Sequence, residues 1–344
     1  MNDSENKPVI VSGSTHPDAA RNIAAILECD LIELKAGAFH NSERHIEILR
    51  TVRGKDVFLI QTSLTGQVDE NLMETAFICD ALRRAGAHSI NLVQFLFPYE
   101  RQDRREIDKQ RNRPKRKAIS SSVIAGFYED LCRVDSMITI HLHTEQIEGF
   151  FKHIPVENIT IATLFTKYLQ EIGALNDKTV FAGPDVGSVK MVADISEMLD
   201  CDYVIIDKRR DGSETKVMKV IGDVKDRIVV IYDDQIDTAG TIIGAAEKLI
   251  EMGAIEVYVI ATHFVGSNGA LQRLLDSKIK KIIVTDTVPT PMLAQYPDRF
   301  AVLSVVPLIA KVITNIFNNE SLQEAVAHKV GKIHAKDLFS EKGV

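Results

Sequence analysis

Residues 227–241 read RIVVIYDDQIDTAGT and place carboxylates, hydroxyls and a glycine side by side. The residues of interest are Asp233, Asp234, Asp237, Thr238, Ala239, Gly240 and Thr241. Backbone N–H groups at the start of a following helix, joined by threonine hydroxyls, form a cradle for a phosphate group. A glycine there lets the backbone approach the anion closely. The segment therefore predicts an anion site at the start of a helix.

The carboxylates beside this cradle would repel a simple phosphate ion. The conflict is resolved if the ligand carries a phosphate at one end and hydroxyl groups or a divalent cation at the other. A sugar phosphate has this chemistry. The alternative is that the paired aspartates cap a strand and DTAGT is an ordinary helix start. The joint arrangement favours the ligand.

Nine apolar, β-branched runs predict the strands that must position this segment. They fall at 8–12, 56–61, 90–95 and 137–140, then at 179–182, 203–206, 227–232, 257–261 and 281–284. Continuous apolar runs are typical of strands buried on both faces of a parallel sheet. The spacing predicts helices over 71–85 and 242–252, with Gly86 and Gly253 as stops.

Alternating strands and helices predict an α/β fold, and the pattern runs twice. We expect two similar domains, residues 1–158 and 159–344, each a mostly parallel sheet flanked by helices. Ligands of such sheets bind beyond the carboxyl ends of the strands, where the segment at 233–241 lies.

Composition excludes several classes of protein. The 344 residues are 45% hydrophobic with a net charge of −7, which argues against a nucleic-acid-coating protein. No apolar stretch is long enough for a membrane span, and the P-loop, GxGxxG, HExxH and GxSxG motifs are missing. Four widely spaced cysteines and an N-terminus without secretion-signal features predict a cytoplasmic protein.

Residues 101–117, RQDRREIDKQRNRPKRK, hold nine basic and three acidic side chains with almost nothing apolar. Such a segment cannot form core, so we expect an exposed loop or arm.

The segment at 233–241 resembles the phosphoribosyl-diphosphate loop of type I phosphoribosyltransferases and of ribose-phosphate diphosphokinases. Likeness to the second family extends over about residues 10–288. It rests on VSGSTHPDAARNIA, FHNSE, VRGKDVFLIQ, DENLME, FPYERQDRR, QIEGFF, GPDVG, DKRR, IGDVKDR, YDDQIDTAGT and VTDT. The resemblance implies two type I phosphoribosyltransferase-like domains and a homo-oligomer, commonly a hexamer. It also implies transfer of the diphosphoryl group of ATP to the 1-hydroxyl of ribose 5-phosphate, giving phosphoribosyl diphosphate and AMP.

The resemblance also assigns roles by position. Residues 233, 234 and 237–241 match the ribose 5-phosphate loop, and Lys208 and Arg210 match a catalytic flexible loop running to Lys219. The ATP contacts would be Phe39, Asn41, Glu43, Arg101 and Gln102. A phenylalanine ring suits stacking on adenine and a forked arginine suits a polyphosphate. The family more often has Asp-Gly-Glu in the hairpin.

The cofactor implied is Mg²⁺, with His143 and Asp185 at matched metal positions. The family reads Asp-Leu-His where this chain has His141-Leu142-His143, so imidazole replaces a carboxylate. Three roles remain open for this imidazole: it bonds a metal-bound water, it bonds a phosphate, or it favours a softer ion such as Mn²⁺, which accepts nitrogen more readily. If the two histidines lie on a strand, they point to one face.

Two departures keep alternatives open. His141 and a basic loop longer than the family's favour a non-catalytic regulatory homologue that associates with catalytic subunits. The intact Lys208, Arg210 and 233–241 segment oppose it. A phosphoribosyltransferase is the second alternative, although it would not need FHNSE or ERQD. For the long loop we rank an altered subunit contact first and nucleic acid last.

Overall fold

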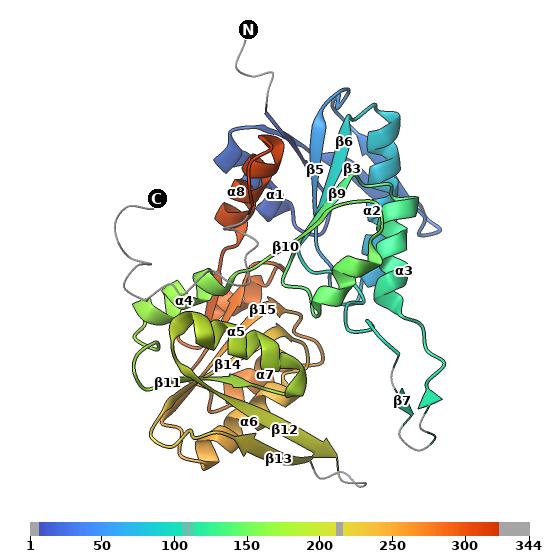
Figure 1. Ribbon diagram of the computed structural model, residues 1–344. Coiled ribbons are helices and arrows are strands. Elements are labelled where there is room, and N and C mark those ends of the chain that lie inside the picture. Colours follow the sequence, from blue (N-terminus) through green and yellow to red (C-terminus); the bar gives the residue numbers. More distant parts are fainter. Residues whose placement is uncertain (1–6, 106, 109–110, 112, 211–215, 323–344) are drawn as a thin grey trace. The chain divides into compact units, whose positions relative to one another are not determined.

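The computed structural model describes residues 7–105, 107–108, 111, 113–210 and 216–322. These residues form two compact units (Figure 1). Unit 1 contains the described residues up to 159 together with 287–289 and 305–322, and unit 2 contains 160–286 and 290–304.

Helix α8 (Val306–Phe317) differs from the predicted division, which placed it in the second domain. It packs against α1 (Pro17–Leu27) of unit 1. Its buried face, which includes Ile309 and Ile313, explains the packing, since these side chains leave water there. The sequence pattern reveals such an apolar face but not which sheet it covers.

Unit 1 is built on a six-stranded, entirely parallel sheet. In order across the sheet its strands are β10 (Val156–Ile159), β9 (Ser136–Ile140), β6 (Ser89–Gln94), β5 (Asp56–Gln61), β1 (Val9–Ser12) and β2 (Asp30–Ile32). Beside α1 and α8, its helices are α2 (Val68–Arg84), α3 (Ser120–Gly126), the π-helix η2 (Phe127–Leu131) and the 3-10 helix η3 (Glu145–Phe150).

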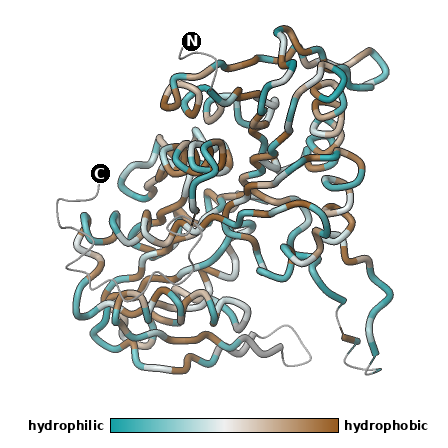
Figure 2. Tube along the Cα trace, turned by 45° about the horizontal axis from the view of Figure 1, so that its top comes forward, coloured by the Kyte–Doolittle hydropathy of each residue, from teal (hydrophilic) through white to brown (hydrophobic). Residues whose placement is uncertain are grey.

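Two hairpins leave this sheet. One joins β3 (Leu34–Ala38) to β4 (Arg44–Ile48), and the other joins β7 (Ile107–Asp108) to β8 (Arg113–Pro114). The second hairpin occupies the predicted basic arm, whose described basic side chains are exposed as expected. The arm is coloured mostly as hydrophilic in Figure 2.

Unit 2 has a seven-stranded sheet that is parallel except for one edge strand. In order its strands are β13 (Lys216–Ile221, antiparallel), β12 (Asp202–Arg210), β11 (Thr179–Gly183), β14 (Ile228–Ile236), β15 (Glu256–Phe264), β16 (Lys281–Thr285) and β17 (Phe300–Leu303). Its helices are α4 (Ala162–Glu171), η4 (Val186–Ser188), α5 (Val189–Leu199), α6 (Gly240–Glu251), α7 (Ala270–Asp276) and η5 (Pro291–Gln295).

The predicted α/β class with two mostly parallel sheets is confirmed, and each of the nine apolar runs lies on a strand. Side chains from these runs contribute to a buried apolar cluster in each unit. Gly86 and Gly253 follow the two predicted helices at φ +83° and +98°, a conformation that favours glycine. No helix in the described part of the chain is long and apolar enough to cross a membrane.

Candidate active site

The carboxylate pair lies on β14, which runs through Ile236 rather than ending before Asp233. Asp234 is buried, and its amide N–H donates to Oδ1 of Asp233 at 3.0 Å. The side-chain amide of Gln235 donates to Oδ2 of Asp234 at 3.3 Å. Two neighbouring carboxyl groups are therefore fixed by the strand itself at the carboxyl edge of the sheet.

Burial raises the pKa of Asp233 well above its usual range, and the adjacent charge of Asp234 and then that of Asp185 raise it further. The local field thus disfavours the ionised form of this carboxyl group. A cation or a set of hydroxyl donors placed here would relieve the repulsion. The chemistry of the donor set consequently fits a polyhydroxyl ligand or a hard cation.

Helix α6 begins directly after the predicted phosphate loop. Ala239 precedes it with φ +63°, a left-handed conformation that is uncommon for a residue with a side chain. The Arg273 guanidinium donates to the Thr238 carbonyl from Nε at 3.1 Å and from Nη2 at 2.6 Å. Ser267 donates to Asp237. Bonds from α7 and from the loop before it thus hold the turn that presents the N-terminus of α6.

Gly240 has space around it, because a Cβ built there would meet nothing nearer than Thr238 Oγ1 at 3.9 Å. Gly240 is also the first residue of α6, so the backbone N–H groups at this helix start are not covered by a side chain from Gly240 itself. The cradle for a phosphate stays a prediction.

Asp185 follows β11, the strand that pairs with β14. Its carboxylate accepts from the N–H groups of Gly187 at 2.8 Å and Ser188 at 3.2 Å, which caps the short helix η4. Asp185 lies close enough to raise the pKa of Asp233. The chain passes from β11 to β12 on one side and returns to β14 on the other, which is the switch point where open α/β sheets bind ligands.

Lys208 and Arg210 lie at the end of β12, opposite Met218 and Lys216 of β13. Their side chains and residues 211–215 lie outside the part that the structure describes. The segment 208–219, expected as a flexible loop, therefore begins in β12 and ends in β13. Because β12 is parallel to β11, Lys208 is at the same sheet edge as Asp185.

In unit 1 the turn between β3 and β4 carries the three predicted adenine contacts. Phe39 is 58% exposed, and its ring lies 4.9 Å from that of His45 between centroids. The Phe39 N–H donates to the Glu43 carbonyl at 2.8 Å, and Asn41 Oδ1 accepts from the Glu43 N–H at 3.2 Å. Asn41 therefore shapes the turn and leaves the Phe39 ring open to solvent.

The other predicted ATP contacts, Arg101 and Gln102, are exposed residues in the loop that follows β6. Gln102 Oε1 accepts from Ser120 Oγ at 2.6 Å, and its carbonyl accepts from Ser121 Oγ at 3.0 Å. These bonds fix the loop to the start of α3.

Sequence reasoning missed Glu100 and Asp103, the two buried acids on either side of Arg101 and Gln102. Glu100 accepts from the His143 N–H at 3.1 Å. Asp103 accepts from Thr144 Oγ1 at 3.0 Å and from Gln146. The ERQD and HLHTEQ motifs thus form one loop cluster. The sequence signal for this cluster was the presence of two acids, Glu100 and Asp103, in the otherwise exposed ERQD motif.

The expectation that His141 and His143 share one face of a strand is wrong, because β9 ends at Ile140. His141 has φ +51°, and its N–H donates to the Ile159 carbonyl at 3.2 Å. Asp, Asn and His are the side-chain-bearing residues most often found in this conformation. Either Asp or His suits this backbone.

Within the described ranges, no three His, Cys, Asp or Glu side chains gather closely enough to hold a metal ion. Asp185 belongs to unit 2, whereas His141 and His143 belong to unit 1. Neither unit by itself builds a closed metal cage from these residues. They fit an ion that keeps most of its water or arrives with a polyphosphate, as Mg²⁺ does.

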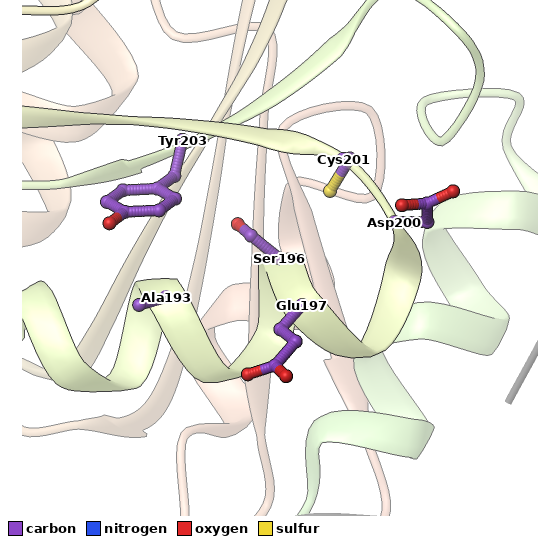
Figure 3. A pocket seen from close by; sticks show the side chains of 6 residues that line it. All are labelled: Ala193, Ser196, Glu197, Asp200, Cys201 and Tyr203. Carbon is purple, nitrogen blue, oxygen red and sulfur yellow. The ribbon is translucent and has the colours of Figure 1, made fainter. Parts of the chain in front are cut away.

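A hollow of about 350 Å³ lies elsewhere on unit 2 (Figure 3). It is lined by Ala193, Ser196, Glu197, Asp200, Cys201 and Tyr203. These residues come from the end of α5 and the start of β12, whereas Lys208 is near the end of that strand. The hollow is therefore separate from the carboxylate edge.

Comparisons with known proteins cover most of the chain. A family model described as the N-terminal domain of ribose phosphate pyrophosphokinase matches residues 8–131. A second, described as a phosphoribosyl synthetase-associated domain, matches residues 204–326.

Similar proteins include the ribose-phosphate pyrophosphokinase of Helicobacter pylori, 39% identical over 91% of this chain and 94% of that protein. The ribose-phosphate pyrophosphokinase of Fusobacterium nucleatum is 38% identical over 93% of this chain and 98% of that protein. The crystal structure of phosphoribosylpyrophosphate synthetase from Mycobacterium smegmatis matches with a TM-score of 0.82 and 33% identity, covering 91% of this chain and all of that one.

Proposed function

The chain belongs to the ribose-phosphate pyrophosphokinase family and is an enzyme of that family, and from this premise we propose which residues carry the reaction. The substrates are ATP and ribose 5-phosphate, and the products are phosphoribosyl diphosphate and AMP. The single observation that carries the assignment is the paired Asp233–Asp234 beside the N-terminus of α6, at the switch point of the unit 2 sheet.

Ribose 5-phosphate binds with its phosphate on the first N–H groups of α6 and the hydroxyls of Thr238 and Thr241. Its ribose hydroxyls donate to Asp233 and Asp234. The raised pKa of Asp233 supports this orientation, since hydroxyl donors stabilise the ionised carboxylate that burial disfavours. Asp237, held by Ser267, completes the loop.

ATP binds to unit 1. Phe39 stacks on the adenine ring, with Asn41 and Glu43 beside it in the same turn. Arg101 and Gln102 contact the polyphosphate, because a forked guanidinium matches phosphate oxygens. The exposed Phe39 ring and the fixed loop of Arg101 support these roles.

In the transfer step the 1-hydroxyl of ribose 5-phosphate attacks the β-phosphorus of ATP. A new bond forms between that oxygen and the β-phosphorus, and the bond from the β-phosphorus to the α,β-bridging oxygen breaks. AMP leaves with the bridging oxygen, and the hydroxyl proton is released to water. Lys208 and Arg210 stabilise the negative charge that develops on the transferring group. Mg²⁺ would neutralise polyphosphate charge when bound. The candidate groups for binding it are His141 and His143 in unit 1 and, separately, Asp185 in unit 2. Mn²⁺ is the alternative ion.

We further propose a homo-oligomer, a hexamer as the family resemblance implies, located in the cytoplasm and with no nucleic acid partner. The exposed apolar side chains of Val123 and Leu131, 65% and 62% exposed, support a protein contact on unit 1. Light scattering on the purified protein measures the assembly directly, and a monomeric mass would contradict it.

The test of the function is AMP formation from ATP with and without ribose 5-phosphate. We expect AMP only when both substrates are present. Asp233→Asn raises the KM for ribose 5-phosphate about 10- to 100-fold, which corresponds to one charged hydrogen bond. Asp177→Asn, an exposed aspartate just before β11, is the control and leaves KM unchanged. No AMP from the purified protein would favour the regulatory homologue, and an unchanged KM in Asp233→Asn would reject the sugar-phosphate site.

A further inference from the structure

Glu74 of α2 is a carboxylate with no exposed surface, and the proposed chemistry does not use it. Its Oε1 accepts from the Ser14 N–H at 2.8 Å and from Gln61 Nε2 at 3.3 Å. Its Oε2 accepts from Ser14 Oγ at 2.7 Å and from Arg44 Nη1 at 2.8 Å. Four donors from three separate segments therefore converge on one buried acid.

Arg44 is the partner that carries the charge. Its guanidinium spans two acids of α2, with Nη1 at 2.8 Å from Glu74 and Nη2 at 2.7 Å from Glu70. The Arg44 side chain is 24% exposed; its partner Glu74 is fully buried, whereas Glu70 is 58% exposed. A planar fork held by two carboxylates fixes orientation as well as distance.

Arg44 also lies at the root of the turn that carries Phe39. It is the first residue of β4, directly after Glu43, and it pairs with Ala38 across the hairpin. Among the described residues, β3 and β4 pair with each other and not with the main sheet. The hairpin tip is therefore not held by a backbone ladder to the rest of unit 1, and Arg44 attaches it to α2.

We propose that Arg44 and Glu74 are positioning residues for the nucleotide. Their ion pair sets the angle of the 39–43 turn, and through Glu74 it couples that turn to the Ser14 loop after β1. The inference depends on the proposed function in one respect, namely that this turn contacts the adenine. Neither residue touches a substrate in this account.

The test measures KM and kcat separately for the variant Arg44→Met. This variant keeps most of the side-chain length but loses the fork, so the turn samples other orientations. We expect the KM for ATP to rise about tenfold, roughly 1.4 kcal/mol. The kcat and the KM for ribose 5-phosphate stay within about twofold, because unit 2 is unchanged. Arg44→Lys keeps the charge without the fork and falls between wild type and Arg44→Met.

A matched control lies on the same hairpin. Lys35 and Glu47 form an exposed ion pair at 3.6 Å, farther from the turn. An exposed pair contributes little, so Lys35→Met leaves the KM for ATP unchanged. If Lys35→Met raised the KM for ATP as much as Arg44→Met, the inference would be wrong, because loss of any charge on the hairpin would then be enough to weaken ATP binding.

The remaining outcomes distinguish the inference from its premise. Phe39→Ala tests the turn itself and is expected to raise the KM for ATP. If Phe39→Ala has no effect, the proposed adenine contact is wrong. If Phe39→Ala raises KM while Arg44→Met does not, the positioning role alone is wrong. A fall of the apparent kcat that follows the folded fraction measured by circular dichroism, with the KM for ATP unchanged, would mean that Arg44 only stabilises the fold. Should Arg44→Met not fold, Arg44→Lys supplies the same KM comparison.

Discussion

The two units share a sheet topology but differ at the same place within it. In unit 1 the first strand, β1, has β2 on one side and β5 on the other, and in unit 2 the strand β11 has β12 on one side and β14 on the other. In unit 1 this switch point is filled by the chain's own polar groups. Thr15 donates to Gln61, and the Thr62 N–H donates to Thr15 Oγ1 at 2.8 Å.

Unit 2 leaves carboxylates at the equivalent place, where burial and mutual repulsion raise the pKa of Asp233. Glu74 in unit 1 is also a buried acid, but four donors surround it. The sheet topology creates a switch point suited to a ligand in both units. Where donors of the chain satisfy the buried acid, as in unit 1, it stabilises the fold, and where they do not, as in unit 2, the carboxylates are left for a ligand.

The largest effect expected from this difference is in unit 2. Lys208→Ala lowers kcat by about 10²–10⁴, the range for losing one preorganised charge donor, while ATP binding barely changes. Steady-state kinetics and equilibrium ATP binding measure the two quantities. If Lys208→Ala lost ATP affinity but kept its kcat at saturating ATP, nucleotide recognition would lie in unit 2 and the division of roles between the units would be wrong.

A second prediction tests whether the unit 1 switch point is closed. A Cβ on Gly13 would lie 2.2 Å from Cδ of the buried Gln61. Gly13→Ala therefore lowers the free energy of unfolding by about 1–3 kcal/mol, the usual cost of overpacking. Urea denaturation measures the change. Gly149→Ala, where no atom lies within 4 Å of the added Cβ, is the control, and equal stability of the two variants would show that the site has room.

The third prediction concerns repulsion in unit 2. Because the folded state raises the pKa of Asp233, it holds a proton that the unfolded chain releases above about pH 4. Stability without ligand therefore falls as pH rises from about 4 towards the folded-state pKa. Asp233→Asn lacks this loss, so we expect it to melt at a higher temperature than wild type at pH 7.

Thermal denaturation from pH 4 to pH 8 measures this effect, and the advantage of the variant over wild type should grow with pH. Asp177→Asn should follow wild type throughout. If the melting temperatures of Asp233→Asn and wild type changed with pH in parallel, repulsion at Asp233 would not destabilise unit 2, and the proposed electrostatic difference between the units would be wrong.

The smallest effect is expected at His141, where unit 1 has imidazole at a position that is a carboxylate in the family pattern. His141→Asp suits the backbone at φ +51° and shifts the ratio of Mg²⁺- to Mn²⁺-supported activity towards Mg²⁺ by a few-fold. Titrating both ions against both proteins gives the ratio. Identical metal curves would show that His141 does not face the metal.

The sequence could predict the buried strands because apolar runs such as 228–232 have no other stable environment. It could also predict the segment at 233–241, since its chemistry is local. It could not predict β10 or β17, whose short runs are only partly buried. The β3–β4 hairpin was expected from the family resemblance rather than from periodicity.

Long-range polar contacts were the other part that sequence reasoning could not supply. Glu74 looked like an ordinary helix-face acid, and its burial depends on Ser14 and Arg44, 60 and 30 residues away. Asp103 became a buried acceptor only because Thr144 and Gln146 approach it. No periodic pattern specifies such contacts, because each requires the folded sheet to exist first.

The packing of α8 on α1 sets an order for folding during synthesis. Residues 160–286 carry six of the seven strands of unit 2 as one uninterrupted stretch, so most of that sheet can form once this stretch has left the ribosome, and β17 is added by residue 303. Unit 1 begins at the N-terminus but needs residues 305–322 to cover α1. Its apolar face stays exposed until nearly the whole chain is made. The half that is translated first is thus the half that finishes folding last, and it is the one that depends on protection from aggregation in the interval.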